Sequence, residues 1–195
     1  IYDVHLQDLS RAEASLRQVA KLAPTHLETL DRLASVLSRE NKALEAARLL
    51  EELIRRTTGE TELRDYRIRL AAAVESAGQP RQAELLLESL RAEQPTEIDV
   101  ILAAADHYQR QGAAPAEAMH LNRAVTDLRS AIDADPGSEA LWTTLVRVLH
   151  RRHGPGPASC AASAAIALGH PASLFDGDVS RQNEALGEPK VPMSK

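Results

Sequence analysis

Aromatic residues make up only 3% of this 195-residue sequence, and cysteine occurs once, as Cys160. A single cysteine allows neither an intramolecular disulfide nor a cysteine-cluster metal site. No apolar run approaches the ~20 residues that cross a bilayer, which predicts no membrane insertion, and no signal peptide is visible. The formal net charge is −5, which disfavours a nucleic-acid partner because binding a polyanion depends on basic patches. These absences leave the location open between the cytoplasm and the bacterial periplasm.

Motifs that carry enzyme chemistry are also absent from the sequence. It contains no phosphate-binding glycine loop, no GxSxG, no HExxH and no calcium-loop pattern. The adjacent carboxylates Glu51 and Glu52 diverge by ~100° on a helix and favour a solvated face over a shared site. The sequence therefore predicts no enzyme and no cofactor within these residues.

Apolar residues form 44% of the sequence and follow a repeated frame. Gly78 suits a left-handed helix end and Pro80 the first turn of a following helix. The frame in that helix is a small residue, two apolar residues four and seven positions later, and a proline that ends it: Ala83, Leu87, Leu90 and Pro95. A small residue lets a neighbouring helix approach, and the apolar residues pack against it.

The same frame recurs four more times. The copies are Ala12, Leu16, Val19 and Pro24; Ala46, Leu50 and Leu53, with Thr58 in the place of proline; Ala124, Leu128, Ala131 and Pro136; and, as the weakest, Ser159, Ser163, Ile166 and Pro171. The leading small residues are separated by 34, 37, 41 and 35 residues. This spacing indicates an internal repeat near 34 residues, each containing two helices.

A second frame precedes the first in four of the five units. Its members are Leu30, Leu33, Ala34 and Leu37; Arg67, Leu70, Ala71 and Val74; Ile101, Ala104, Ala105 and Tyr108; and Trp142, Leu145, Val146 and Leu149. Trp142 and Leu145 match the W-x2-L start of the tetratricopeptide repeat, and the two phased frames resemble that family over roughly residues 1–170.

The resemblance implies an all-α, right-handed superhelical solenoid of about five antiparallel helical hairpins. We expect the repeat domain at residues 1–171, with a first repeat so truncated that the chain is expected to be cut from a longer protein. Residues 172–195 lose the period, and we expect an irregular tail or cap there, with Leu174 and Phe175 docked on the last helices.

The fourth unit departs from the others in length. Twelve residues separate Gly112 from Ala124, against five between Gly78 and Ala83. Seven extra residues make nearly two helical turns, so we predict one long helix over about 115–134. The alternative is a longer loop over residues 113–116 followed by a helix that begins late.

In the tetratricopeptide family the first helix of each repeat lines an inner groove that holds a partner peptide. If the first helices of this chain line the groove in the same way, the residues at the groove-facing positions form a predicted partner-binding set: Asp31, Ser35, Arg39, Asp65, Ala72, Glu75, Asp99, Asp106, Arg110, Arg147, His150 and Arg151. Chaperone-binding members clamp a peptide carboxylate with lysine and asparagine. Asp31, Ser35, Leu102 and Asp106 stand at those positions here, so the clamp is missing.

Two further candidates concern the C-terminal part of the repeat. Arg147 and Arg151, with Arg152 beside them, suit an acidic or phosphorylated segment, the alternative being ordinary solvated charges. His150 and His153 share a helical face, as metal ligands would, but the flanking arginines repel a cation and favour a plain basic helix end. Cys160 lies among alanines and is expected to be a small buried residue.

We therefore predict a protein–protein interaction scaffold that binds a partner peptide or helix in its concave groove. One alternative keeps the fold and makes the chain an accessory region of a larger enzyme or export machine, such as a glycosyltransferase or a bacterial polysaccharide-secretion protein. Another is self-assembly through exposed terminal helices.

Overall fold

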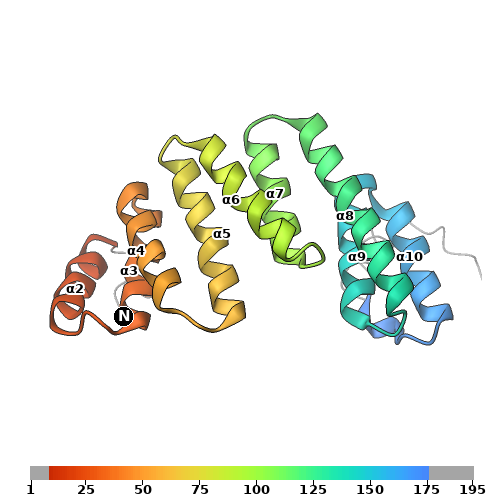
Figure 1. Cartoon of the computed structure of the whole chain (residues 1–195), viewed down its shortest axis with the longest axis horizontal. Helices are drawn as coiled ribbons and strands as arrows, with labels where there is room; N and C mark the ends of the chain where they lie inside the picture. The colour runs from red at the N-terminus through yellow and green to blue at the C-terminus, as the bar shows by residue number, and fades with distance from the viewer. Residues whose placement is uncertain (1–8, 176–195) are drawn as a thin grey trace, which may run out of the picture. The chain divides into compact units, whose positions relative to one another are not determined.

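The computed structural model describes residues 9–175 and contains, over these residues, α-helices, one short 3-10 helix and no strand (Figure 1). The described part comprises four complete antiparallel hairpins and, before them, the second helix of another. This confirms the predicted all-α fold of repeated hairpins. The chain divides into two compact units, Ile1–Glu93 and Gln94–Lys195, which are described separately.

Unit 1 contains five described helices that pack on one another in chain order. They are α2 (Leu9–Leu22), α3 (Leu27–Arg39), α4 (Ala43–Arg56), α5 (Glu60–Ser76) and α6 (Pro80–Glu93). The leading small residues of the frame are buried at the contacts, with Ala12 at 4% exposure and Ala46 and Ala83 at 0%. Their short side chains let adjacent helices approach, and the leucines of the frame fill the space around them.

Four helix ends within residues 9–175 close in the same way. A residue in the left-handed conformation follows the helix, and the next N–H donates to a carbonyl five residues back. In the α3–α4 turn Asn41 has φ 59° and Lys42 N donates to Leu37 O at 2.9 Å. Glycine takes the left-handed position in the other three: Gly78, Gly112 and Gly169. The left-handed conformation strains most residues that have a Cβ. This explains why glycine or asparagine stands between the two helices of a repeat.

Unit 2 contains the remaining described helices. They are α7 (Ile98–Arg110), α8 (Ala114–Ala134), α9 (Glu139–His153), α10 (Pro155–Ala167) and the 3-10 helix η1 (Ala172–Leu174). Helix α8 has 21 residues against 14 in α6, which confirms the long helix predicted for this unit and excludes the longer loop. Helix α10 begins at Pro155, because a proline in the first turn of a helix loses no hydrogen bond.

The weakest copy of the frame was placed one residue too late. In α10 the buried side chains are Ala158, Ala162 and Ala165, whereas Ile166 is 43% exposed. The buried stripe keeps the spacing of four and seven, and Ala158 lies 34 residues after Ala124. Because alanine recurs along this helix, the sequence alone offers several overlapping stripes, and the bulk of Ile166 favoured the wrong one.

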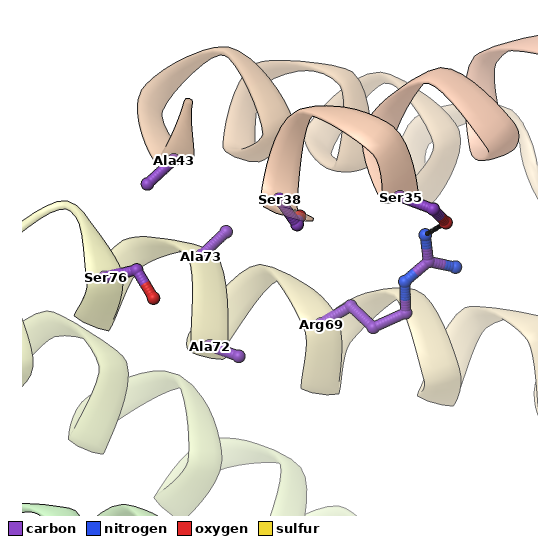
Figure 2. A pocket seen from close by; sticks show the side chains of 7 residues that line it. All are labelled: Ser35, Ser38, Ala43, Arg69, Ala72, Ala73 and Ser76. Atoms are coloured by element: carbon purple, nitrogen blue, oxygen red, sulfur yellow. Dashed lines mark hydrogen bonds between the residues drawn. The ribbon is translucent and has the colours of Figure 1, made fainter. Parts of the chain in front are cut away.

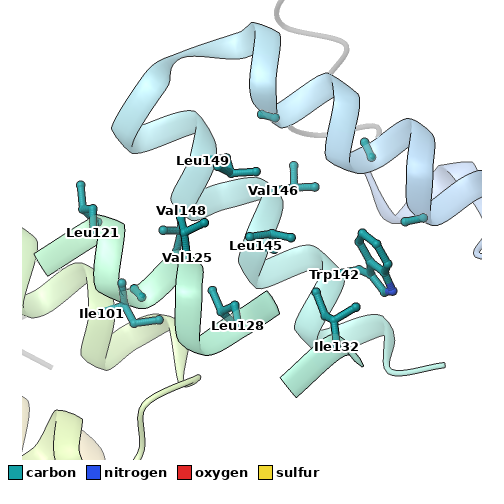
Figure 3. Close-up of a cluster of buried hydrophobic side chains, with 14 of the residues drawn as sticks. Ile101, Leu121, Val125, Leu128, Ile132, Trp142, Leu145, Val146, Val148 and Leu149 are labelled. Atoms are coloured by element: carbon teal, nitrogen blue, oxygen red, sulfur yellow. The ribbon is translucent and has the colours of Figure 1, made fainter. Parts of the chain in front are cut away.

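The core of unit 2 is a cluster of side chains from α7 to α10 (Figure 3). Trp142 is 8% exposed and donates through Nε1 to Pro136 O at 3.0 Å. His170 Nε2 donates to the same carbonyl at 2.9 Å. Phe175 is 2% exposed within the cluster, and Leu174 packs against it, which confirms that these two residues dock on the last helices. The other residues of the predicted tail, from 176 onward, lie outside the described part.

Candidate functional site

The first helices of two hairpins in unit 1 are joined by a guanidinium group. Arg69 on α5 donates through Nη1 to Asp31 Oδ1 on α3 at 2.6 Å, and through Nη2 to Ser35 Oγ at 2.8 Å. Asp65, one turn before Arg69, lies 3.2 Å from the same Nη1. Ser35 Oγ donates in turn to Asp31 O at 3.1 Å. We call Asp31, Ser35, Asp65 and Arg69 the Arg69 cluster.

The charges of this cluster stabilise one another. Burial by itself lowers the pKa of Arg69, but hydrogen bonds to Asp31 and Asp65 and the charges of both carboxylates raise it above its ordinary value. The guanidinium also lies 5.6 Å from the ring centroid of Tyr66, a cation–π contact. Burial, followed by the charge of Asp31, raises the pKa of the Tyr66 hydroxyl. Arg69 is thus held in one position as a fixed cation.

A pocket of about 190 Å³ opens beside the Arg69 cluster. Its lining, apart from the guanidinium, consists of serine and alanine: Ser35, Ser38, Ala43, Ala72, Ala73 and Ser76. Figure 2 shows Arg69 at one end, bonded to Ser35, and Ser76 toward the other end, with α3 facing α5 across the hollow. Ala72 and Ser76 are exposed on α5.

Unit 2 has an arginine with a comparable role. Arg151 on α9 lies 3.0 Å from Asp106 Oδ1 on α7 and 3.0 Å from Glu117 Oε1 on α8. Its Nη2 also donates to Gln109 Oε1 at 3.0 Å. We call Asp106, Gln109, Glu117 and Arg151 the Arg151 cluster. Because this guanidinium already has three partners, it is poorly placed to capture an acidic segment as the sequence analysis suggested.

The structure thus brings together some of the predicted site residues and leaves others apart. Asp31, Ser35 and Asp65 meet in unit 1, and Asp106 meets Arg151 in unit 2. Glu75 is half-buried on α5, and the remaining members of the predicted set lie exposed along the first helices: Arg39, Asp99, Arg110, Arg147 and His150. Arg152, the third arginine of the predicted anion site, donates to Asn122 Oδ1 at 3.1 Å.

Sequence reasoning missed the residue that organises the unit 1 site. Arg69 follows Asp65 by four positions on a predicted first helix, so helical periodicity places both on one face. That signal was present in the sequence. The partners on α3 were not predictable, because they depend on how α3 and α5 pack. Glu117 was missed for a similar reason, since it lies on a second helix and outside the predicted groove.

Cys160 is exposed and not buried as predicted. The register shift in α10 explains this, because the buried stripe passes through Ala158 and Ala162 and turns Cys160 outward. Over residues 9–175 no three His, Cys, Asp or Glu side chains are grouped to hold a metal ion. No helix in that range combines the length and apolar character needed to cross a membrane.

Comparison with known proteins supports the fold. Neither a family model nor a curated protein matches the sequence. Among solved structures, a tetratricopeptide repeat protein from Parabacteroides merdae is 16% identical with a TM-score of 0.50, covering 97% of this chain and 91% of that chain. A crystal structure of the MamA protein is 14% identical with a TM-score of 0.50, covering 95% and 90%. The chain is a helical-repeat protein with the fold of tetratricopeptide-repeat proteins.

Proposed function

We propose that this chain is a protein-interaction scaffold and that α3 and α5 of unit 1 bind an extended segment of a partner protein. The observation that carries the proposal is the pocket beside the Arg69 cluster, whose lining includes Ser35 and Ala72 of the predicted partner-binding set. A fixed cation, two carboxylates and a wall of small side chains form a surface suited to contact an extended polypeptide segment.

The size of the pocket favours a protein segment over a small molecule. Sites for drug-sized ligands usually measure about 300–1,000 Å³. A hollow of about 190 Å³ suits one side chain, or a short stretch of backbone, of a longer ligand that continues along the helices. Serine and alanine in the wall allow a main chain to approach closely, and the hydroxyl groups offer it hydrogen bonds.

The charge on this face favours a partner with a basic residue. Two carboxylates of the Arg69 cluster share one guanidinium, which leaves the cluster with a net negative charge. The side chain of Asp65 is 58% exposed and Asp31 is 33% exposed, so both remain accessible to a second cation. A lysine or arginine beside the segment that enters the pocket would pair with Asp65 at the rim.

A single substitution tests whether the pocket is the binding site. Ala72→Arg introduces a long charged side chain at the exposed wall of the pocket. The control, Ala92→Arg, makes the same change at an exposed position of α6 that does not line the pocket. The full chain with each change is used to retain partners from an extract, and the identified partner is then titrated. We expect Ala72→Arg to raise the Kd on the order of tenfold or more, and Ala92→Arg to leave it nearly unchanged.

Circular dichroism provides the folding control, because both changes are on exposed helical positions and should leave the melting curve nearly the same. If the two variants bind a partner as well as the original chain, the pocket is not the binding surface. An equal loss in both variants would likewise show that the effect is not specific to the wall at Ala72.

A further inference from the structure

A second hollow lies in unit 2, outside the surface proposed above. It measures about 570 Å³ and lies between α8, α9 and α10. Four nearly buried apolar side chains form its floor: Ile132, Trp142, Leu145 and Leu149. Figure 3 shows Ile132 and Trp142 at the same end of the core cluster. On the α10 side the wall is made of small or uncharged residues, Pro157, Cys160 and Ala161.

The wall helix has an unusual composition for a helix at the surface. None of the 13 residues of α10 is charged, and apolar side chains occur all around it. Helices of this kind are normally buried on every side. Here Ile166 is 43% exposed and Leu168, just after the helix, is 62% exposed. This part of unit 2 therefore presents an apolar surface to solvent.

The rim of the groove carries two opposite charges that do not pair with each other. Arg129 and Asp133 are exposed, four residues apart on α8, and both border the groove. Within the described residues neither makes a hydrogen bond or an ion pair. A basic residue that precedes an acidic one on a helix is the less favourable order for such a pair, so both charges are directed to solvent.

We propose that this groove binds a second copy of the same chain, with α8 of the two copies antiparallel about a two-fold axis that passes between Arg129 and Asp133. In a two-fold symmetric contact, residue i of one copy contacts residue j of the other, and residue j of the first copy contacts residue i of the second. Arg129 then faces the partner's Asp133, while Asp133 faces the partner's Arg129. The uncharged α10 introduces no like-charge contact. The apolar floor of each groove becomes covered.

Charge reversal tests this arrangement in the full chain. Arg129→Asp gives two acidic rims and Asp133→Arg two basic rims, so each variant alone should associate more weakly, with a dimer Kd raised on the order of tenfold. A mixture of the two variants restores both pairs and should form mixed dimers as tightly as the original chain. The chain that carries both changes should also regain association. Sedimentation equilibrium measures all four cases.

Cys160 supplies an independent readout, since it is the only cysteine and lines the groove. Its alkylation by a maleimide should slow as the protein concentration rises, and should not slow in either single variant. Ala72→Arg in unit 1 is the control that should leave both self-association and alkylation unchanged. This control separates failure of the dimer proposal from failure of the partner-binding proposal.

Three results would overturn the proposal. The original chain could stay monomeric at its highest soluble concentration with Cys160 fully reactive, which would leave the groove to a different protein. Deletion of residues 176–195 could expose Cys160 in a monomeric chain, which would assign the groove to that segment. Finally, self-association could persist in both single variants, which would place the contact elsewhere.

Discussion

The Arg69 cluster and the Arg151 cluster use the same chemistry in two units. In each unit an arginine on a first helix binds an aspartate on the preceding first helix, Asp31 in unit 1 and Asp106 in unit 2. They differ in their other partners. Arg69 binds only first helices, α3 and α5, and a pocket opens beside it. Arg151 also binds Glu117 on a second helix, α8.

The difference shows what the extension of α8 contributes. Glu117 lies in the first turn of α8, within the seven residues that lengthen this helix relative to the other second helices. Asn122 on the same helix accepts from Arg152 of α9. The extension of α8 therefore adds the contact of Glu117 with Arg151 of α9. We conclude that the Arg151 cluster fixes three helices, whereas the Arg69 cluster orders a surface that remains open.

The largest expected effect concerns one buried leucine in each unit. Leu33 and Leu145 occupy the same position of the first-helix frame, and each is 4% exposed. Leu→Ala at a buried site costs about 2–5 kcal/mol. We expect Leu33→Ala to cost more, because Leu145 borders the groove of unit 2, where water can fill the vacated space. Urea unfolding followed by circular dichroism measures both; a larger loss for Leu145→Ala would contradict this explanation.

A smaller effect distinguishes the two ion pairs directly. The pair of Arg69 with Asp31 spans 2.6 Å and the aspartate is 33% exposed, whereas the pair of Arg151 with Asp106 spans 3.0 Å and that aspartate is 46% exposed. Double-mutant cycles with Arg→Met and Asp→Asn should give coupling free energies of about 1 kcal/mol for Arg69 and about 0.5 kcal/mol for Arg151. Equal couplings would mean that exposure does not decide their strength.

The smallest effect is a pH dependence in unit 1. Hydrogen bonds from Lys42, at 2.5 Å, and Arg17, at 2.7 Å, lower the pKa of Glu13 from 4.5 to about 2. A carboxylate whose pKa is lower in the folded state stabilises the fold above its unfolded pKa, so this contribution should be lost as the pH falls from about 4.5 to about 2. Thermal melts across that range should show a shallower loss of Tm in Glu13→Gln. An unchanged slope would refute the assignment.

Most of the fold was predictable from the sequence because its signals are local. The spacing of Ala46 or Ala83 from the apolar residues after it defines a helical stripe, and the left-handed residues mark where helices end. The prediction was wrong in α10, where many alanines permit several stripes and only packing against α9 selects one. Cys160 was misplaced with it.

The candidate site was predictable only in part. Register alone placed Asp31, Ser35 and Asp65 on first helices, and all three lie in the Arg69 cluster. Arg69 contacts all three only because α3 and α5 lie at a suitable distance from each other. No local sequence pattern determines that distance. The predicted anion site at Arg147 and Arg151 had the same difficulty. Residues of α7 and α8 bind Arg151, and no local pattern in the sequence shows that they lie close to it.

The position of the one tryptophan has a practical consequence. Trp142 is the only residue of its kind in the chain, and its indole lies in the apolar core of unit 2. Its emission is therefore an intrinsic optical reporter for that unit alone, while the far-ultraviolet signal averages over every helix. Divergence of the two signals during denaturation would show that the halves of the polypeptide lose their structure in separate steps.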